Sequence, residues 1–168
     1  MNILFYITNH GFGHASRNVP IIEKLLKDKS VDIVFVKSDI ERCDFLQRNL
    51  SKYDNHIKYY TDCYEVGLIL QTGSMHFDCK ATEEAARKNM KLWSDLVERE
   101  RLFILEHNVD IVVSDTVSWP LESARKAGVP SVLIGNFSWA RTYQSIGVAE
   151  DIWRRYEEYY KKASKAIW

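Results

Sequence analysis

The sequence is poor in cysteine, and the few cysteines it has form no pattern. Only three occur, Cys43, Cys63 and Cys79, and no two of them stand in the Cys-x-x-Cys spacing of a zinc site. An odd number at irregular spacing also argues against the disulfide framework of a small secreted protein. We therefore expect three reduced thiols, as in a cytoplasmic protein, and no metal site.

The sequence also lacks an excess of either charge and lacks a long hydrophobic run. Its 23 basic and 23 acidic side chains cancel, so no overall field favours nucleic acid or anionic lipid. The apolar run Ile3–Ile7 is too short for a signal peptide or a membrane span, and no basic region precedes it. With 168 residues, 46% of them hydrophobic, we expect one globular domain in the cytoplasm with no nucleic-acid partner.

What the sequence does contain is an alternation of strand-like and helix-like segments. Short runs rich in β-branched residues are separated by stretches with apolar residues every three or four positions. This order predicts the α/β class, with a Rossmann-like parallel sheet flanked by helices. The strands expected in one sheet are Asn2–Thr8, Val31–Val36, Asp110–Ser114 and Ser131–Ile134, with a shorter strand at His56–Tyr60.

One segment, Thr61–Ala81, is irregular, although Val66–Leu70 within it is a further strand candidate. A loop of this length either covers a substrate or is an ordinary solvated connection, and the sequence leaves both readings open. A long helix is expected to begin at a Thr82 cap and to continue through Ile104. The end of the chain is expected to be helical, up to a strand-like segment at 165–168.

Two glycines and two histidines mark the turn between the first strand and the first helix. Gly11 and Gly13 allow a sharp turn and a close approach of a ligand, and the helix N-terminus that follows favours an anion such as phosphate. The spacing matches neither the dinucleotide fingerprint nor the P-loop. Taken alone, the turn is either a binding loop flanked by His10 and His14 or a structural turn with a histidine at the start of a helix.

Position in the sheet brings this turn together with two other stretches. In an open parallel sheet the carboxyl ends of the strands share one edge, and ligands bind there. The expected strands deliver His10–Arg17, Ser114–Ser118 and Gly135–Trp139 to that edge. We therefore expect the functional site where these three stretches meet.

These three stretches together resemble the N-terminal domain of GT-B glycosyltransferases, and in particular the glycosyltransferase-like domain of arabinokinases and its stand-alone microbial relatives. The likeness rests on Gly11–Arg17, on the blocks at 112–115 and 127–132, and on Asn136–Trp139, while Asn9 replaces a glycine of the family opening. The resemblance implies that residues 1–168 form a single Rossmann-like domain, the acceptor-side half of a GT-B protein. The second Rossmann-like domain is absent from this chain, which is either a fragment or a natural half-enzyme.

The resemblance implies transfer of a sugar from a nucleotide sugar, UDP-linked, to a small-molecule acceptor, with no other cofactor. A histidine oriented by a carboxylate suits removal of the acceptor's hydroxyl proton. The implied catalytic residues are His14 and Asp115, with His10 as the other candidate histidine. The implied substrate-binding residues are Gly11, Phe12, Gly13, Arg17, Asn136, Phe137, Ser138 and Trp139. Since the second domain carries most of the donor site, this chain alone is expected to be inactive.

Two other classes of function remain open. A non-catalytic sugar- or nucleotide-binding module would use the same edge of the sheet without transferring a group. A small hydrolase or epimerase would use the same histidine, although no Gly-x-Ser-x-Gly elbow is present for an α/β-hydrolase. Aromatic and apolar side chains near the C-terminus also predict an exposed surface and self-association through the C-terminal helix. They are Trp153, Tyr156, Tyr159, Tyr160, Ile167 and Trp168.

Overall fold

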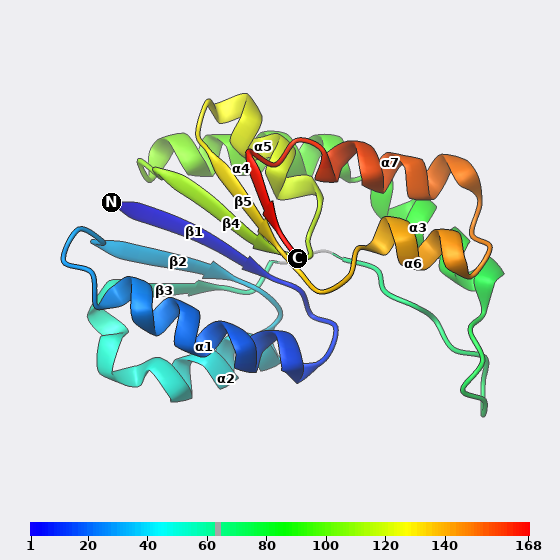
Figure 1. Cartoon of the computed structure of the whole chain (residues 1–168), viewed down its shortest axis with the longest axis horizontal. Coiled ribbons are helices and arrows are strands. Elements are labelled where there is room, and N and C mark those ends of the chain that lie inside the picture. The colour runs from blue at the N-terminus through cyan, green and yellow to red at the C-terminus, as the bar shows by residue number, and fades with distance from the viewer. Residues whose placement is uncertain (63–64) are drawn as a thin grey trace.

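Six strands form one parallel sheet in the computed structural model, which describes residues 1–62 and 65–168. The order across the sheet is β3-β2-β1-β4-β5-β6, so β1 lies at the point where the chain changes its direction of strand addition (Figure 1). The strands are β1 (Asn2–Ile7), β2 (Ile33–Lys37), β3 (Ile57–Tyr60), β4 (Ile111–Asp115), β5 (Ser131–Ile134) and β6 (Lys165–Ile167). The expected α/β class and parallel strands are confirmed, with small shifts of their ends.

Helices cover both faces of the sheet. Figure 1 shows α1 and α2 on one face and α4, α5 and α7 on the other. The helices are α1 (Phe12–Leu26), α2 (Ile40–Leu50), α3 (Cys79–Met90), α4 (Trp93–Glu106), α5 (Trp119–Ala127), α6 (Trp139–Ser145) and α7 (Glu150–Tyr160), with a 3₁₀ turn at Ser51–His56. Within the two described ranges, none of them is both long and apolar enough to cross a membrane.

The alternation of side chains along β1 explains why both faces need a cover. Leu4 and Tyr6 belong to the core on the α4–α5–α7 side, whereas Ile3, Phe5 and Ile7 belong to the core beneath α1 and α2. All five are buried. A strand that is apolar on both sides is typical of a parallel sheet enclosed between two helical layers.

Several helix ends have a local cause. The Asp39 carboxylate caps α2 by accepting a 2.9 Å hydrogen bond from the backbone N–H of Arg42. Pro120 stands in the first turn of α5, where its missing N–H costs nothing. Gly128 ends α5 with φ of 75°, a left-handed conformation that a side chain disfavours.

The prediction of one long helix that begins at a Thr82 cap is wrong in two respects. The cap is Asp78, which accepts a 2.9 Å bond from the N–H of Ala81, and Thr82 lies buried inside α3. The helix also stops at Met90, and α4 starts anew at Trp93. Trp93 is buried at the start of α4, and its indole N–H donates to the side-chain oxygen of Asn89 at 2.8 Å.

The irregular segment contains no strand in its described part. Val66–Leu70 is therefore wrong as a strand, because only Leu70 pairs, in an isolated antiparallel bridge with Phe77. Cys43 and Cys79 are free thiols, as expected. Cys63 lies outside the described residues.

The end of the chain is helical, in two helices, and then forms the strand β6 where a strand-like segment was expected. Tyr156 and Tyr159 are buried against Trp93: their ring centroids lie 4.8 and 4.7 Å, respectively, from that of Trp93. Tyr160 is buried as well. The expectation that these tyrosines expose an apolar surface is wrong, because α4 of the same chain already covers them. Self-association remains a prediction that rests on Trp168, 66% exposed, and its neighbour in β6.

Candidate active site

Three segments that are distant in the sequence meet at the carboxyl edge of the sheet, as expected. His14 lies in the first turn of α1, Asp115 ends β4, and Asn136 follows β5. Arg17 of α1 joins them, since its guanidinium donates to Asp115 and, over 2.9 Å, to the side-chain oxygen of Asn136. The edge is therefore a connected group of polar side chains rather than a set of separate strand ends.

His14 and Asp115 form a direct hydrogen bond. The ring Nδ1 of His14 lies 2.9 Å from Oδ1 of Asp115, and both side chains are almost fully buried. An ionised carboxylate can only accept, so Nδ1 carries the proton and donates it. In the neutral imidazole this leaves Nε2 as the nitrogen with a free lone pair. The pair can thus orient one basic nitrogen in a fixed direction.

Asp115 is held by donors on both of its oxygens. Oδ1 accepts from His14, Arg17 and the hydroxyl of Thr116, while Oδ2 accepts from Arg17 at 3.0 Å and from Asn18. Burial alone raises the pKa of this carboxyl, but the hydrogen bonds and charges of His14 and Arg17 outweigh it and hold the pKa below its usual value. Asp115 is therefore ionised throughout the neutral range.

Thr116, which follows β4, has an unusual backbone. Its φ of 71° is left-handed, a costly conformation for a β-branched residue. Three hydrogen bonds hold it there: its N–H donates to Ile134 at 3.1 Å, its hydroxyl to Asp115 at 2.9 Å, and Tyr160 donates to its carbonyl at 2.6 Å. Strain of this kind gathers at functional sites, where the surrounding structure enforces it.

The glycine-rich turn leaves the N-terminus of α1 open. Gly11 has φ of 80°, and no side chain in the described part of the protein caps the helix. Gly11, Phe12 and Gly13 are exposed, and a Cβ on either glycine would meet nothing within 4 Å. The first N–H groups of the helix can therefore receive an anion. Phe12 itself packs against Phe45 of α2, with ring centroids 5.7 Å apart.

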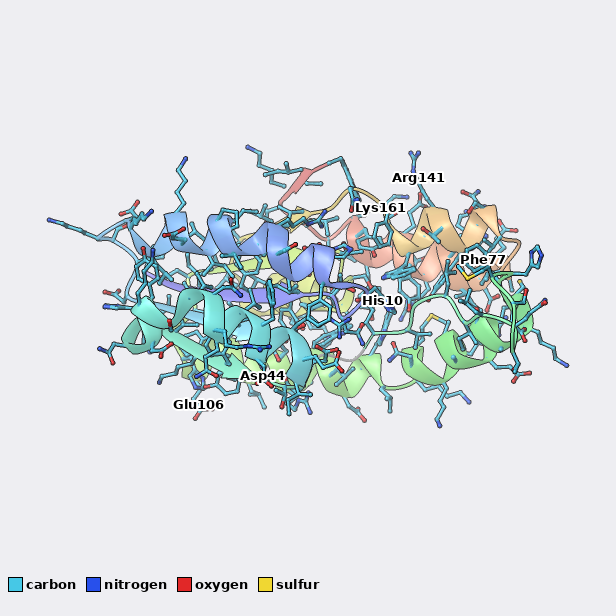
Figure 2. The ribbon with its side chains drawn as sticks, turned by 90° about the horizontal axis from the view of Figure 1, so that it is seen from below. His10, Asp44, Phe77, Glu106, Arg141 and Lys161 are labelled. Carbon is cyan, nitrogen blue, oxygen red and sulfur yellow. The ribbon has the colours of Figure 1, made fainter. Side chains whose placement is uncertain are left out.

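His10 is placed differently from His14. Its ring packs edge-on against Trp139, 4.7 Å between centroids, and lies so close to Gly67 that a Cβ there would stand 1.9 Å from it. Burial, with a contribution from His14, lowers the pKa of His10 to about 4, so its ring is neutral at physiological pH. Figure 2 shows it in the middle of the molecule, between the α1 and α6 sides. Of the two histidines, it is His14 that contacts Asp115.

The stretch after β5 contributes one residue that contacts His14 and two residues that stabilise the local structure. Phe137 packs edge-on against the His14 ring, with centroids 5.6 Å apart. Ser138 caps α6 by accepting from the N–H of Arg141, and Trp139 is buried. The indole N–H of Trp139 donates to Glu65 at 2.6 Å. Phe137 thus contacts the hydrogen-bonded pair His14–Asp115, called the dyad from here on. Ser138 and Trp139 mainly stabilise the local structure.

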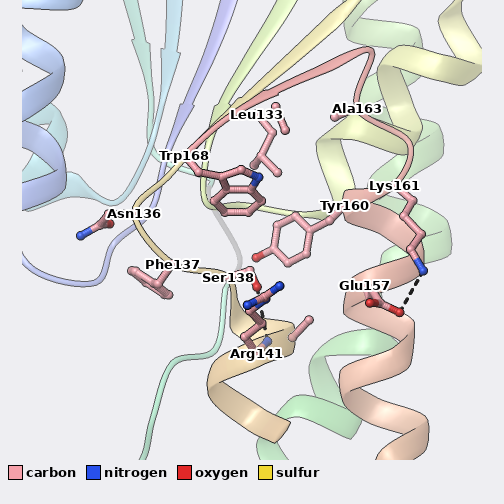
Figure 3. A pocket seen from close by; sticks show the side chains of 12 residues that line it. Leu133, Asn136, Phe137, Ser138, Arg141, Glu157, Tyr160, Lys161, Ala163 and Trp168 are labelled. Atoms are coloured by element: carbon pink, nitrogen blue, oxygen red, sulfur yellow. Dashed lines mark hydrogen bonds and ion pairs between the residues drawn. The ribbon is translucent and has the colours of Figure 1, made fainter. Parts of the chain in front are cut away.

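A cavity of about 640 Å³ opens next to this stretch, between β5, β6, α6 and α7. Figure 3 shows the rings of Phe137, Tyr160 and Trp168 around it, with Asn136 and Arg141 also at its walls. Its size is that of a small-molecule site. Phe137, which lines the cavity, contacts His14, and Asn136, which also lines it, bonds Arg17, so the cavity lies next to the His14–Asp115 pair.

Three residues at the site were not named individually from the sequence, although Thr116 lies in the expected stretch Ser114–Ser118. Asn18 bonds Asp115, and its polar side chain was indistinguishable from a solvent-facing position of a helix. Thr116 is recognisable only by its backbone angle. Glu65 bonds Trp139 and Thr8 from the irregular segment, where no periodicity marks it. In the described part of the chain no group of three or more His, Cys, Asp or Glu side chains is arranged to hold a metal.

Comparison with known proteins identifies a family to which the chain is similar in sequence. The family model described as glycosyl transferase family 1 matches residues 1–164. An L-arabinokinase of Arabidopsis thaliana is 28% identical over 163 residues, which is 92% of this chain and 15% of that protein. This chain therefore spans only a small part of that relative.

Solved structures share the fold at low identity. Arabidopsis thaliana UGT89C1 complexed with quercetin superposes with a TM-score of 0.62 at 14% identity, covering 98% of this chain and 42% of that one. CalG4, the calicheamicin glycosyltransferase, gives a TM-score of 0.57 at 13% identity, covering 94% and 45%. This chain matches less than half of each, and the shared part has a GT-B glycosyltransferase fold.

Proposed function

The chain belongs to glycosyl transferase family 1 and has the fold of an N-terminal GT-B domain, and from that premise we propose that it is the acceptor-side half of a nucleotide-sugar-dependent glycosyltransferase. The observation that supports this most directly is the 2.9 Å hydrogen bond between His14 and Asp115. It leaves one imidazole nitrogen available as a base at the edge of the sheet where ligands bind.

In this proposal His14 takes the proton of an acceptor hydroxyl. The hydroxyl oxygen forms a bond to the anomeric carbon of the donor sugar, the bond from that carbon to the diphosphate breaks, and the proton moves to Nε2. The imidazolium that results is stabilised by the Asp115 carboxylate, which stays ionised and keeps the ring oriented. The acceptor occupies the cavity beside Phe137.

The donor is a nucleotide sugar, and we propose a UDP-linked one. UGT89C1, which shares the fold, was also solved with UDP-L-rhamnose, with a TM-score of 0.60. The leaving diphosphate would meet the free N–H groups at Gly11–Gly13, so neither metal nor other cofactor is needed in the proposal. A second Rossmann-like domain supplies most of the donor site, so this chain alone is inactive. The proposal places the protein in the cytoplasm, with no nucleic-acid partner.

A non-catalytic binding module is the second candidate, and one observation favours it. Arg17 bonds both oxygens of Asp115 and so competes with His14 for the carboxylate's charge. A carboxylate that mainly anchors an arginine would leave a sugar- or nucleotide-binding edge without a strong base.

The test uses the chain together with its second domain, with UDP-sugars as donors and quercetin as a trial acceptor. Release of UDP is measured for the wild type, for His14→Ala and for His56→Ala, which alters an exposed histidine away from the site. Loss of a general base should lower kcat by about 10²–10⁴-fold, whereas the His56 variant should match the wild type. Equal turnover in all three proteins, or no UDP release by a folded wild type, would leave the binding module as the better account.

A further inference from the structure

Glu65 lies between two elements of the site and bonds both. Its Oε1 accepts the indole N–H of Trp139, the first residue of α6, at 2.6 Å. Its Oε2 meets the hydroxyl of Thr8, directly after β1. The carboxyl group is buried, although the residue as a whole keeps some exposure. The side chain therefore bridges the β1 turn to α6.

The two residues that follow fasten the same segment. The carbonyl of Val66 accepts a 2.6 Å hydrogen bond from the hydroxyl of Tyr143 in α6. Gly67 lies on the imidazole ring of His10, so closely that any side chain at position 67 would collide with it. Residues 65–67 are thus held to α6 on one side and to the β1–α1 turn on the other.

A chain of aromatic contacts leads from this bridge to the dyad. Trp139 packs edge-on against Phe137 with centroids 4.9 Å apart, and Phe137 packs edge-on against His14 at 5.6 Å. Trp139 also contacts His10 at 4.7 Å. The orientation of the indole therefore sets the wall against which the His14 ring rests, and the Glu65 carboxyl fixes that indole by its N–H.

We propose that Glu65 is a positioning residue: it clamps segment 65–67 across the end of β1 and α6 and thereby fixes Trp139, Phe137 and the ring of His14. The part of this inference that concerns turnover rests on the proposed transferase function, whereas the clamp itself does not. Glu65 touches no reacting atom and acts only through the aromatic rings.

The clamp works in the protonated form of the carboxyl. Neither hydrogen-bond partner of Glu65 is a cation. Burial raises its pKa to about 8, the hydrogen bonds of Thr8 and Trp139 offset this only in part, and the negative charge of Asp115 raises it further.

The other ionisable groups that face Glu65 do not compensate its charge. Tyr143, Tyr156 and Tyr160 have pKa values raised by burial and remain neutral, and the His10 ring is neutral as well. An ionised Glu65 accepts from both the Thr8 hydroxyl and the Trp139 indole; a protonated Glu65 keeps the indole bond, and the Thr8 hydroxyl can then accept from it instead. Ionisation above pH 8 leaves a buried charge that no cation of residues 1–62 or 65–168 pairs with, so the segment should loosen there.

The test follows the indole N–H of Trp139 by ¹H–¹⁵N NMR on this chain between pH 6 and 10, with the peak assigned by Trp139→Phe. In the wild type the peak should shift with a midpoint near pH 8. Glu65→Gln keeps an acceptor for the indole and a donor for Thr8 but cannot ionise, so its peak should stay at the low-pH position. In Glu65→Ala the Trp139 indole peak should lie away from the low-pH position of the wild type at every pH. Glu106→Gln, at an exposed site on α4, should titrate as the wild type does.

A wild-type peak that does not move with pH, or a Glu65→Gln peak that behaves like the Ala variant, would overturn the proposal. If the Ala variant does not fold, the comparison of wild type with Gln still decides. In the complete transferase, Glu65→Gln should abolish an alkaline loss of turnover that Glu106→Gln retains. The NMR measurement does not depend on enzymatic activity. It therefore distinguishes a failure of the proposed Glu65 clamp from a failure of the proposed transferase function.

Discussion

Replacing Asp115 by asparagine is the sharpest single perturbation of the site. The carboxylate is fully buried and accepts from donors on both oxygens. Asparagine has the same shape but replaces one oxygen with an NH₂ group, which can only donate. If the remaining oxygen keeps the bonds of His14, Thr116 and Nη2 of Arg17, the NH₂ faces Nε of Arg17 and Nδ2 of Asn18, and these two hydrogen bonds to Asp115 are lost.

The expected cost follows from those two lost bonds. A hydrogen bond to a charged group contributes about 1.5–3 kcal/mol, and Arg17 can recover part of its loss because its side chain is 31% exposed. We therefore expect Asp115→Asn to lower the free energy of unfolding by about 3 kcal/mol at pH 7.

The effect should depend on pH with a definite sign. The folded-state pKa of Asp115 lies below the unfolded value, so its ionisation stabilises the protein above the unfolded pKa of about 4. That stabilisation is lost as the pH falls through the folded-state pKa. The difference between wild type and Asp115→Asn should therefore be largest at neutral pH and should shrink below about pH 4.

Urea unfolding, followed by circular dichroism and tryptophan fluorescence at pH 7 and at pH 3.5, measures both quantities. Asp44→Asn is the matched control, since Asp44 is an exposed residue of α2 and should change little. An Asp115→Asn variant within about 1 kcal/mol of the wild type at pH 7 would refute the reasoning. So would a deficit that grows on acidification.

The remaining predictions concern backbone space and exposed apolar surface. Gly67→Ala should lower the free energy of unfolding by about 1–3 kcal/mol, because the new Cβ would lie 1.9 Å from a carbon of the His10 imidazole. In the control Gly13→Ala the new Cβ meets nothing within 4 Å, so the free energy of unfolding should not fall in the same way. Equal Tm values for the two variants would contradict this. Ile167 and Trp168 are 51% and 66% exposed, so the chain should self-associate at high concentration and Trp168→Ser should reduce it. Sedimentation velocity checks this, and a wild-type monomer at every concentration would speak against it.

Local signals carried most of what the sequence predicted. The strands were visible as β-branched runs between stretches of helical periodicity, because both patterns depend on neighbouring residues. The meeting of His14 with Asp115 was also accessible, since it needs only the strand order and the rule that parallel strands end at one edge.

What the sequence concealed depends on tertiary partners. Glu65 bonds Thr8 and Trp139, 57 and 74 positions away, and nothing in its own irregular surroundings marks it. The tyrosines of α7 showed an apolar face, but only the structure shows that Trp93 covers it. The break between Met90 and Trp93 was concealed as well, because the apolar periodicity continues across it.

The all-parallel pairing of the sheet has a kinetic consequence. Each pairing between the six described strands is parallel, so no hairpin joins two of them, and β1 meets β4 only after a long loop has closed; His14 and Asp115 are 101 positions apart. Closing such a loop costs entropy before any contact repays it, and folds of this kind form slowly. Intermediates that contain only β4, β5 and β6 lack the dyad altogether. A probe of the His14–Asp115 contact would therefore report the completion of folding rather than its start.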